Sequence, residues 1–409
     1  MPPLSTAVAL FVMPQDGHVR RMLPLVHGFA ARGDAPYVFT DVSFRDGVER
    51  AGGQFVDLFA GRPMDEADDE SWPLPCRFVS FAGRFGEEVS REVREIGAQV
   101  VLYDTFAYIG PVVAQILDLP HVNVCSGHNR FLAEIESVME PFRDRIVISP
   151  ACEHWVGVLQ DRHGLEEASP WSWARTQSEH LNIYCEPARY LDERNRRALE
   201  PIAFFGSLPP AEEIDARIHA DDHPPFEGDG LRVYVSFGTV MWEAFAEPAL
   251  AAMRVISEAL VERGASAVFS LGGHPLPDED RQTLTAPNVI VADYVDQWRV
   301  LAHADVFVTH HGLNSTHEAI WSGVPMISYP FVADQPSQAA KCSEFGLATP
   351  LSRAPVEPVA KEDVHAALGR VGKEERAMRS ALAAAREWEV QVMAERPAVL
   401  DRILALGSA

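Results

Sequence analysis

The stretch THHGLNSTHE, residues 309–318, joins a run of apolar residues to a helical pattern. Val306–Thr309 is apolar and β-branched, which predicts a buried strand. Ala319–Trp321 belongs to a helical pattern that ends at the sequence Gly323-Val-Pro. The stretch is therefore a turn from a strand into a helix, and turns of this kind are typical of parallel sheets covered by helices.

The same alternation of short apolar runs and longer helical patterns continues along the chain. It predicts an α/β protein with two doubly wound parallel sheets. The strands that we expect are Ala7–Pro14, Tyr37–Asp41, Gln99–Asp104, His121–Cys125, Arg232–Phe237, Ala267–Leu271, Val289–Ala292, Val306–Thr309 and Met326–Tyr329.

A change of composition marks the boundary between the two expected domains. Residues 207–230 are rich in Pro, Asp, Glu and Gly and poor in apolar residues, which is typical of an exposed linker. We therefore expect an amino-terminal domain over 1–206 and a carboxy-terminal domain over 231–385. A final helix, broken at Pro397, should bring residues 386–409 back to the first domain.

The composition excludes several classes of protein. No run of about 18 apolar residues is present, so no membrane span is expected. The net charge of −24 disfavours a nucleic-acid partner. Five scattered cysteines without a C-x-x-C pair predict a reducing, cytoplasmic setting with no disulfide framework. Only three of the 35 basic residues are lysines, so an anion would be bound by backbone amides, Arg or His.

A plain helix cap is the simplest interpretation of residues 309–318. Ser315 and Glu318 have the spacing of a capping box, in which the hydroxyl and the carboxylate each accept a hydrogen bond from a terminal amide. This interpretation leaves His310, Gly312 and Asn314 unexplained.

An anion-binding turn and a metal site are the two alternatives. The amino terminus of a helix attracts an anion through its free N–H groups and its dipole, and a glycine before it lets the anion approach. A metal site would use His310, His311 and His317, but their spacing differs from the i, i+4 pair of zinc enzymes. From this stretch alone, all three interpretations remain open.

Polar residues after neighbouring strands favour the anion. Ligands of open α/β sheets bind at the carboxyl ends of the strands, where such residues would meet. An aromatic ring, an amide, a carboxylate and two turns with glycine suit the base, ribose, diphosphate and sugar of a nucleotide sugar. The residues outside the turn at 310–318 are Gly238 and Thr239 in VSFGT, Tyr294 and Gln297 in YVDQW, and Asp334 and Gln335 in ADQ.

The segments YVDQW (294–298) and THHGLNSTHEAIWSGVPMISYPFVADQ (309–335) resemble the donor-binding signature of the UDP-glycosyltransferase family, glycosyltransferase family 1. This family includes plant secondary-product and bacterial macrolide glycosyltransferases. The resemblance implies the GT-B fold, in which two Rossmann-like doubly wound domains face each other across a cleft. It also implies that residues 1–206 bind the acceptor and residues 231–385 bind the nucleotide sugar.

The resemblance further implies a role for each residue of the signature. Tyr294, where the family usually has Trp, would stack on the uracil, and Gln297 would face the base or ribose. Glu318 would accept the ribose hydroxyls, while Asp334 and Gln335 would hold hydroxyls of the sugar. The diphosphate would be held on two turns, by Gly238 and Thr239 on one and by His310, Gly312, Asn314 and Ser315 on the other.

His18 and Asp104 are the candidate catalytic pair. Each follows or ends an expected strand of the first sheet, although a histidine or aspartate there is often only a helix cap. If they meet, the carboxylate would orient the imidazole and stabilise its protonated form, as a general base requires. GHV and LYD also match the family's catalytic His and its Asp partner, so the resemblance implies His18 as the base and Asp104 as its orienter, with no metal.

The expected function is the transfer of a sugar, with inversion, to a hydroxyl of a hydrophobic small molecule such as a polyketide, macrolide or phenol. The co-substrate would be UDP-glucose or another UDP-sugar, or a dTDP-sugar, with no further cofactor. The acceptor site could be lined by Tyr103, Phe106, Tyr108, the loop 126–130 and the Trp-rich segments near 155 and 171. For each of them, packing in the hydrophobic core is an equally good explanation.

Two other functions remain possible from the sequence. A sugar-nucleotide epimerase on the same fold would act on the donor itself, and a glycosyltransferase-like helper protein would bind a partner enzyme without catalysis. The expected partners are the nucleotide sugar and the acceptor, and the expected assembly is a monomer or a homodimer.

Overall fold

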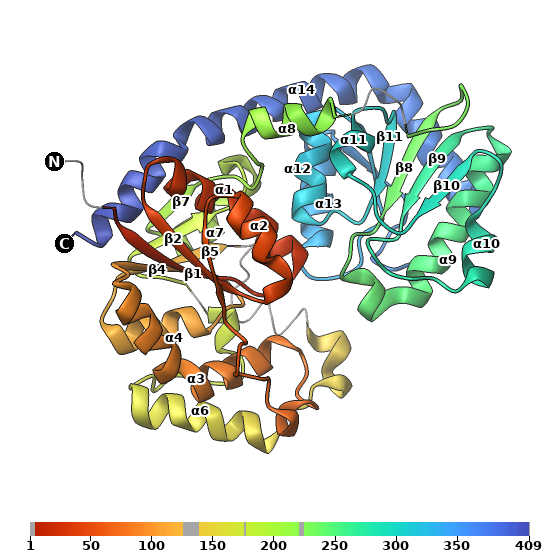
Figure 1. Cartoon of the computed structure of the whole chain (residues 1–409). Helices are drawn as coiled ribbons and strands as arrows, with labels where there is room; N and C mark the ends of the chain where they lie inside the picture. Colours follow the sequence, from red (N-terminus) through yellow and green to blue (C-terminus); the bar gives the residue numbers. More distant parts are fainter. Residues whose placement is uncertain (1–4, 126–138, 176, 221–224, 409) are drawn as a thin grey trace. The chain divides into compact units, whose positions relative to one another are not determined.

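The computed structural model describes residues 5–125, 139–175, 177–220 and 225–408 (Figure 1). The chain divides into two compact units. The first comprises Met1–Ser207 and Val392–Ala409, and the second comprises Leu208–Gln391.

The first unit is built on a seven-stranded parallel sheet with the order β3-β2-β1-β4-β5-β6-β7. Its strands are β1 (Ala7–Phe11), β2 (Ala35–Thr40), β3 (Gln54–Asp57), β4 (Val100–Asp104), β5 (His121–Cys125), β6 (Leu181–Tyr184) and β7 (Ile202–Phe204). Its α-helices include α1 (Asp16–Ala31), α2 (Arg45–Arg50), α3 (Pro75–Ile96), α4 (Ile109–Leu117), α6 (Pro150–His163) and α7 (Glu193–Ala198). Short 3-10 helices are η1 (Val42–Phe44), η2 (Glu66–Asp68), η3 (Glu140–Arg145), η4 (Ser172–Arg175) and η5 (Ala188–Tyr190).

The second unit is built on a six-stranded parallel sheet with the order β10-β9-β8-β11-β12-β13. Its strands are β8 (Arg232–Ser236), β9 (Ser266–Ser270), β10 (Val289–Ala292), β11 (Val306–Thr309), β12 (Met326–Ser328) and β13 (Ala348–Pro350). Its helices include α8 (Ala211–Ile218), α9 (Met241–Glu262), α10 (Asp278–Leu284), α11 (Gln297–Leu301), α12 (Leu313–Ser322), α13 (Gln335–Glu344) and most of α14 (Lys361–Leu406).

In each sheet, the strand that comes first in the sequence lies in the interior of the sheet. The next two strands are added on one side of it, and all later strands are added on the other side. The predicted α/β class with two doubly wound sheets is therefore confirmed. The winding reverses between β1 and β4 in the first unit and between β8 and β11 in the second. Ligands of such folds bind at these reversal points, outside the carboxyl ends of the strands.

Each sheet is covered by helices that bury an apolar face. In α1, Val19, Met22, Leu25, Val26 and Phe29 are all buried, as expected for a helix with one apolar stripe. The strands β1 and β8 lie in the middle of their sheets and are almost entirely buried, which explains their continuous apolar sequences.

The linker and the carboxy-terminal helix differ in detail from the expectation. Residues 207–230 contain the helix α8, whose Arg217 guanidinium bonds Asp296 at 3.2 Å within the second unit. The predicted break at Pro397 is wrong, because α14 continues through this proline. Its end, from Val392 onward, belongs to the first unit.

In the described part of the chain, no helix is long and apolar enough to cross a membrane. All five cysteines are buried as free thiols.

The packing of α3 against α6 gives a test of the fold of the first unit. Gly83 lies in α3, where an added Cβ atom would come within 2.3 Å of the Trp155 carbonyl oxygen in α6. We expect Gly83→Ala to destabilise the protein by about 1–3 kcal/mol, because the two helices would have to move apart. Thermal and urea unfolding of the full chain would measure the change.

Gly157→Ala is the matched control. Gly157 lies inside α6, and an added Cβ atom would meet nothing within 4 Å. Alanine should therefore stabilise this helix by about 0.5–1 kcal/mol. Equal effects of the two substitutions would contradict the described packing.

Candidate functional site

His18 is held in the first turn of α1, directly after the central strand β1. The helix begins at Asp16 after an extended Gln15, and the His18 amide donates to the Gln15 carbonyl at 3.0 Å. Asp104 is the last residue of β4, which pairs with β1 across the reversal point. The two residues therefore reach the same point of the sheet from neighbouring strands.

The structure brings His18 and Asp104 into a buried hydrogen bond. The Nδ1 atom of His18 lies 2.7 Å from Oδ2 of Asp104. A carboxylate accepts from Nδ1–H, which leaves Nε2 as the ring nitrogen that can take up a proton. His18 is 9% exposed, whereas Asp104 is fully buried.

The pKa of Asp104 lies below its ordinary value in spite of its burial. Burial by itself would raise the pKa of this carboxyl, but the charge and hydrogen bond of His18 and the charge of Arg21 together lower the pKa below its ordinary value. Arg21 is itself buried in α1, where its Nε donates to the Gly17 carbonyl at 3.0 Å.

The aromatic residues expected near this pair divide into two groups. Phe106 lies beside the dyad, with its ring centroid 5.2 Å from that of His18 and 5.4 Å from that of Trp173. Tyr103 and Tyr108 are buried in the hydrophobic core of the first unit. The loop 126–130 lies outside the described residues.

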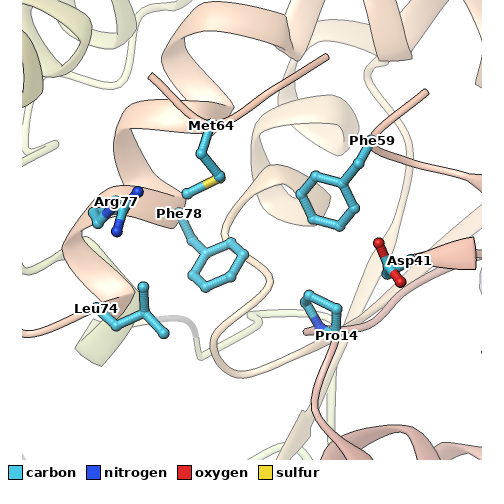
Figure 2. Close-up of a pocket in the computed structure, with 7 residues that line it drawn as sticks. All are labelled: Pro14, Asp41, Phe59, Met64, Leu74, Arg77 and Phe78. Carbon is cyan, nitrogen blue, oxygen red and sulfur yellow. The ribbon is translucent and has the colours of Figure 1, made fainter. Parts of the chain in front are cut away.

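A cavity of about 360 Å³ opens at the carboxyl edge of the first sheet (Figure 2). Its walls come from the segments that follow β1, β2 and β3 and from the start of α3. Phe59, Met64 and Phe78 point toward one another inside it. The lining residues are Pro14, Asp41, Phe59, Met64, Leu74, Arg77 and Phe78.

In the second unit, the His310 ring is enclosed by the two predicted glycine turns. An added Cβ atom would come within 2.7 Å of the ring's Nε2 at Gly238 and within 2.4 Å at Gly312. Gly238 also has a φ of +73°, which favours glycine. The structure therefore joins the turns after β8 and β11 through one imidazole, at the reversal point of this sheet.

His310 and the neighbouring His311 are held neutral. Burial lowers the pKa of His310 to about 4. Burial, together with the charge that His310 carries once it is protonated, lowers the pKa of His311 to about 3. His311 has φ +60° and bonds within the turn, with Nδ1 at 3.2 Å from the Thr316 hydroxyl and Nε2 at 2.8 Å from the Ser328 hydroxyl.

The predicted capping box is wrong. Helix α12 begins at Leu313, its cap residue is Gly312, and no side chain caps this end. Ser315 thus lies inside the first turn, and half-buried Asn314 precedes it. A helix start capped by glycine directs its first N–H groups to whatever lies beyond the turn, which is the geometry of an anion-binding site.

Gln297 ties α11 to α12. Its Nε2 donates to Oε2 of Glu318 at 2.7 Å and lies 3.2 Å from the Ser315 hydroxyl. Its Oε1 accepts from the Tyr234 hydroxyl at 3.2 Å. The structure therefore brings Gln297, Ser315 and Glu318 together as one polar group.

The remaining signature residues lie on two loops and on the turn after β8. Tyr294 follows β10 and is 54% exposed. Thr239 is half-buried beside Gly238, and Asp334 is half-buried at the start of α13. Gln335 is buried, and its Oε1 accepts a hydrogen bond from the Phe331 amide at 2.9 Å. This bond ties the start of α13 to the loop that precedes it.

The three histidines of the metal interpretation do not converge on one point. Nδ1 of His317 lies 2.7 Å from Oε1 of Glu389 in α14, and both side chains are buried. His311 bonds Thr316 and Ser328, while His310 lies between the glycine turns.

The sequence is similar to those of known glycosyltransferases. The sequence profile described as "UDP-glucoronosyl and UDP-glucosyl transferase" matches residues 218–383, which include every signature residue of the second unit. The uncharacterized UDP-glucosyltransferase YdhE of Bacillus subtilis is 25% identical over 83% of this chain and 84% of its own length. The chain is a glycosyltransferase, and its second unit matches the profile of the UDP-glycosyltransferase family.

Solved structures of similar proteins support the fold of this glycosyltransferase. The crystal structure of the kitacinnamycin glycosyltransferase is similar with a TM-score of 0.76 at 22% identity, over 98% of this chain and 100% of that one. The glycosyltransferase VinC, solved with dTDP, is similar with a TM-score of 0.66 at 15% identity, over 98% and 100% of the two chains. The predicted GT-B fold is therefore confirmed.

The sequence analysis missed two groups of residues. The first group lines the cavity. Of its residues, only Pro14 and Asp41 lie at the end of an expected strand, and the others follow β3, which was not expected, or lie at the start of α3. The second group, His121, Glu179 and His180, meets at the start of β5 and β6. In the sequence, Glu179 and His180 stand next to each other before an apolar run. Nothing in that pattern indicates that the distant His121 lies beside them.

The lowered pKa values predict how the stability of the enzyme depends on pH. Unfolded His310 and His311 take up protons near pH 6.5, whereas their pKa values in the folded enzyme are lowered to about 4 and about 3. The unfolded state therefore binds more protons below pH 6.5, and the free energy of unfolding falls as the pH falls toward 4.

His310→Asn should weaken this dependence by at most about 1.4 kcal/mol per pH unit, because one proton fewer is taken up. Urea unfolding of the full chain at a series of pH values between 4.5 and 7 would measure it, with the exposed His27→Asn as control. An unchanged slope in the His310 variant would show that this imidazole is not held neutral.

Proposed function

We propose that this glycosyltransferase transfers a sugar, preferably glucose, from a UDP-sugar to a hydroxyl of a small hydrophobic molecule, with inversion and without a metal. The observation that carries the proposal is the buried hydrogen bond of 2.7 Å between His18 and Asp104. It gives a glycosyltransferase the base that activation of a hydroxyl requires.

In the proposed reaction, His18 Nε2 removes the proton from the acceptor hydroxyl. The hydroxyl oxygen forms a bond to the anomeric carbon while the bond from that carbon to the diphosphate oxygen breaks, and UDP leaves. One displacement from the opposite face inverts the configuration of the sugar. Asp104 stays ionised and stabilises the imidazolium that His18 becomes.

The proposed diphosphate site is the turn around His310. An anion there meets the start of α12, which has no side-chain cap, and the turn around Gly238 and Thr239. His310, Asn314 and Ser315 are the proposed side-chain partners of the phosphate oxygens. Helix dipole and N–H groups would stabilise the charge on the departing diphosphate without a cation.

The polar group around Gln297 supports a nucleoside next to the diphosphate. We assign the ribose hydroxyls to Glu318 and the base to the exposed ring of Tyr294 and to Gln297. Asp334 is our candidate for the sugar hydroxyls. Gln335 acts by holding the loop that carries Asp334, since its Oε1 accepts from the Phe331 amide at 2.9 Å.

The choice of UDP over dTDP rests on the relatives. The Bacillus subtilis relative is named for UDP-glucose transfer, whereas VinC was solved with dTDP. A panel of both nucleotides with glucose and with a deoxysugar would decide between these donors.

The cavity beside β1 and β3 is the proposed acceptor site. Its volume of about 360 Å³ is at the lower end of that of small-molecule sites. Mostly apolar walls, with Asp41 and Arg77 as polar groups, suit a compact phenol or aromatic polyketide better than a large macrolide ring.

The assignment of the base predicts a selective loss of turnover. His18→Ala should lower kcat about 100- to 10,000-fold, and Asp104→Asn should also lower it strongly because the imidazole loses its orienting carboxylate. The KM for UDP-glucose should change little, because neither residue is assigned to the donor. Formation of the glycosylated phenol and release of UDP would be measured together.

His27→Ala is the control, since His27 is exposed on the same helix α1. Unchanged transfer by folded His18→Ala would refute the base. UDP-sugar turnover that proceeds equally without any acceptor would favour an epimerase or hydrolase instead.

The diphosphate site gives a second prediction. Gly312→Ala would place a Cβ atom within 2.4 Å of the His310 ring and displace it. We expect the affinity for UDP to fall at least tenfold, a loss of about 1.4 kcal/mol, while the weaker binding of uridine stays the same. Calorimetric titration would measure both ligands.

Gly369→Ala is the matched control, because an added Cβ atom there meets nothing within 4 Å. Equal losses for UDP and uridine would contradict the assignment of this turn to the phosphates.

A further inference from the structure

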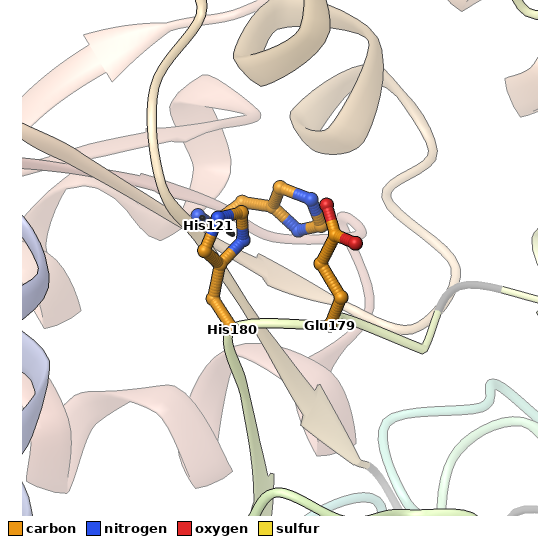
Figure 3. Close-up of side chains that lie close together, drawn as sticks. All are labelled: His121, Glu179 and His180. Carbon is orange, nitrogen blue, oxygen red and sulfur yellow. Dashed lines mark hydrogen bonds between the residues drawn. The ribbon is translucent and has the colours of Figure 1, made fainter.

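A group of metal-ligating side chains lies in the first unit, apart from the proposed catalytic pair (Figure 3). It consists of His121, Glu179 and His180, whose ligand atoms all lie within 4.8 Å of one another. His121 is the first residue of β5, and His180 directly precedes β6. The pairing of Val122 with Leu181 makes them neighbours at the start of two parallel strands.

This group occupies the opposite edge of the sheet from His18 and Asp104. Asp104 ends β4, which pairs in parallel with β5, so the reaction chemistry lies at the carboxyl edge and the group lies at the amino edge. Strands of five residues separate the two edges by roughly 15 Å. The proposed transfer reaction therefore leaves the group without a role.

We propose that His121, Glu179 and His180 bind a divalent transition-metal ion such as Zn²⁺. Two imidazoles and one carboxylate form a ligand set that zinc uses in proteins, with further positions left for water. The two imidazoles bind the cation as neutral ligands, and the carboxylate supplies one negative charge.

The ligand atoms of the three side chains would have to move only a little to bind a zinc ion. Two ligands of a tetrahedral zinc ion lie about 3.3 Å apart, because each bond is about 2.0–2.1 Å long. Glu179 is exposed and the two histidines are half-buried, so the cation can enter from solvent and the Glu179 side chain can move inward.

Neighbouring hydrogen bonds hold the two histidines in place. The Tyr103 hydroxyl lies 3.2 Å from Nδ1 of His121, which leaves Nε2 of that ring for a metal. Ser178 donates its hydroxyl to the His121 carbonyl at 2.6 Å and accepts from the His180 amide at 3.0 Å. These bonds fix the segment before β6 to the start of β5.

One contact opposes metal binding, but weakly. The His121 amide donates to Nδ1 of His180 at 3.5 Å, at the long limit of a hydrogen bond. A cation on His180 costs at most this one bond. The alternative role of the two rings is packing alone, since their centroids lie 4.8 Å apart in an edge-to-face arrangement.

Metal titration of the full chain, without an affinity tag and after treatment with a chelator, tests the proposal. We expect one Zn²⁺ per chain to bind with micromolar or lower Kd, measured in competition with a chromophoric chelator. Glu179→Gln should weaken binding at least tenfold, whereas Glu167→Gln, at another exposed position, should leave it unchanged.

Co²⁺ provides a second measurement that does not depend on stability. Co²⁺ bound to nitrogen and oxygen ligands at low coordination number should give an intense visible absorption in the wild type, and His180→Gln should abolish it while His27→Gln keeps it. Less than one Zn²⁺ per chain at saturation, or equal affinity in Glu179→Gln and Glu167→Gln, would overturn the site.

Discussion

The reversal of winding in a parallel sheet is the constraint on which both proposed sites depend. Where the chain leaves two adjacent strands toward opposite faces of the sheet, the loops separate and the strand ends are uncovered. In the first unit this happens between β1 and β4, and in the second between β8 and β11. The His18–Asp104 pair and the His310 turn stand at these two points.

The proposed diphosphate site in the second unit would have to bind an anion without basic side chains. The chain carries a net charge of −24, and none of its signature residues is Lys or Arg. Burial lowers the pKa of His310 to about 4, so this ring is neutral before a ligand arrives. In this proposal the attraction comes from the start of α12, whose cap residue is Gly312 and whose dipole and N–H groups favour an anion.

The sequence predicted the parts of the structure that local patterns determine. Strands such as β1, β8 and β11 are continuous apolar runs, and their turns carry glycine and polar residues in a recognisable order. The capping box failed because Ser-x-x-Glu is also the spacing of two residues on one helical face. Gln297, from another helix, binds both Ser315 and Glu318 there.

The features that the sequence analysis predicted wrongly or missed depend on contacts between distant segments. Pro397 does not break α14, although a proline inside a helix lacks the amide for one hydrogen bond. The strands β3, β6, β7 and β13, which were not expected, have only three or four residues each. The cavity and the His121 group both depend on such strands, so neither could be predicted.

The burial of Asp104 explains how the pair can act as a base rather than as a simple hydrogen bond. A carboxylate in a dry site attracts a positive charge more strongly than one in water, so it favours the imidazolium formed when His18 takes a proton. The same burial would raise the pKa of Asp104 and let it take the proton itself. The charge and the hydrogen bond of His18 oppose this by lowering that pKa, and Arg21, one turn along α1 from His18, adds to their effect. In the proposed mechanism these interactions favour a proton on the imidazole over one on the carboxyl group.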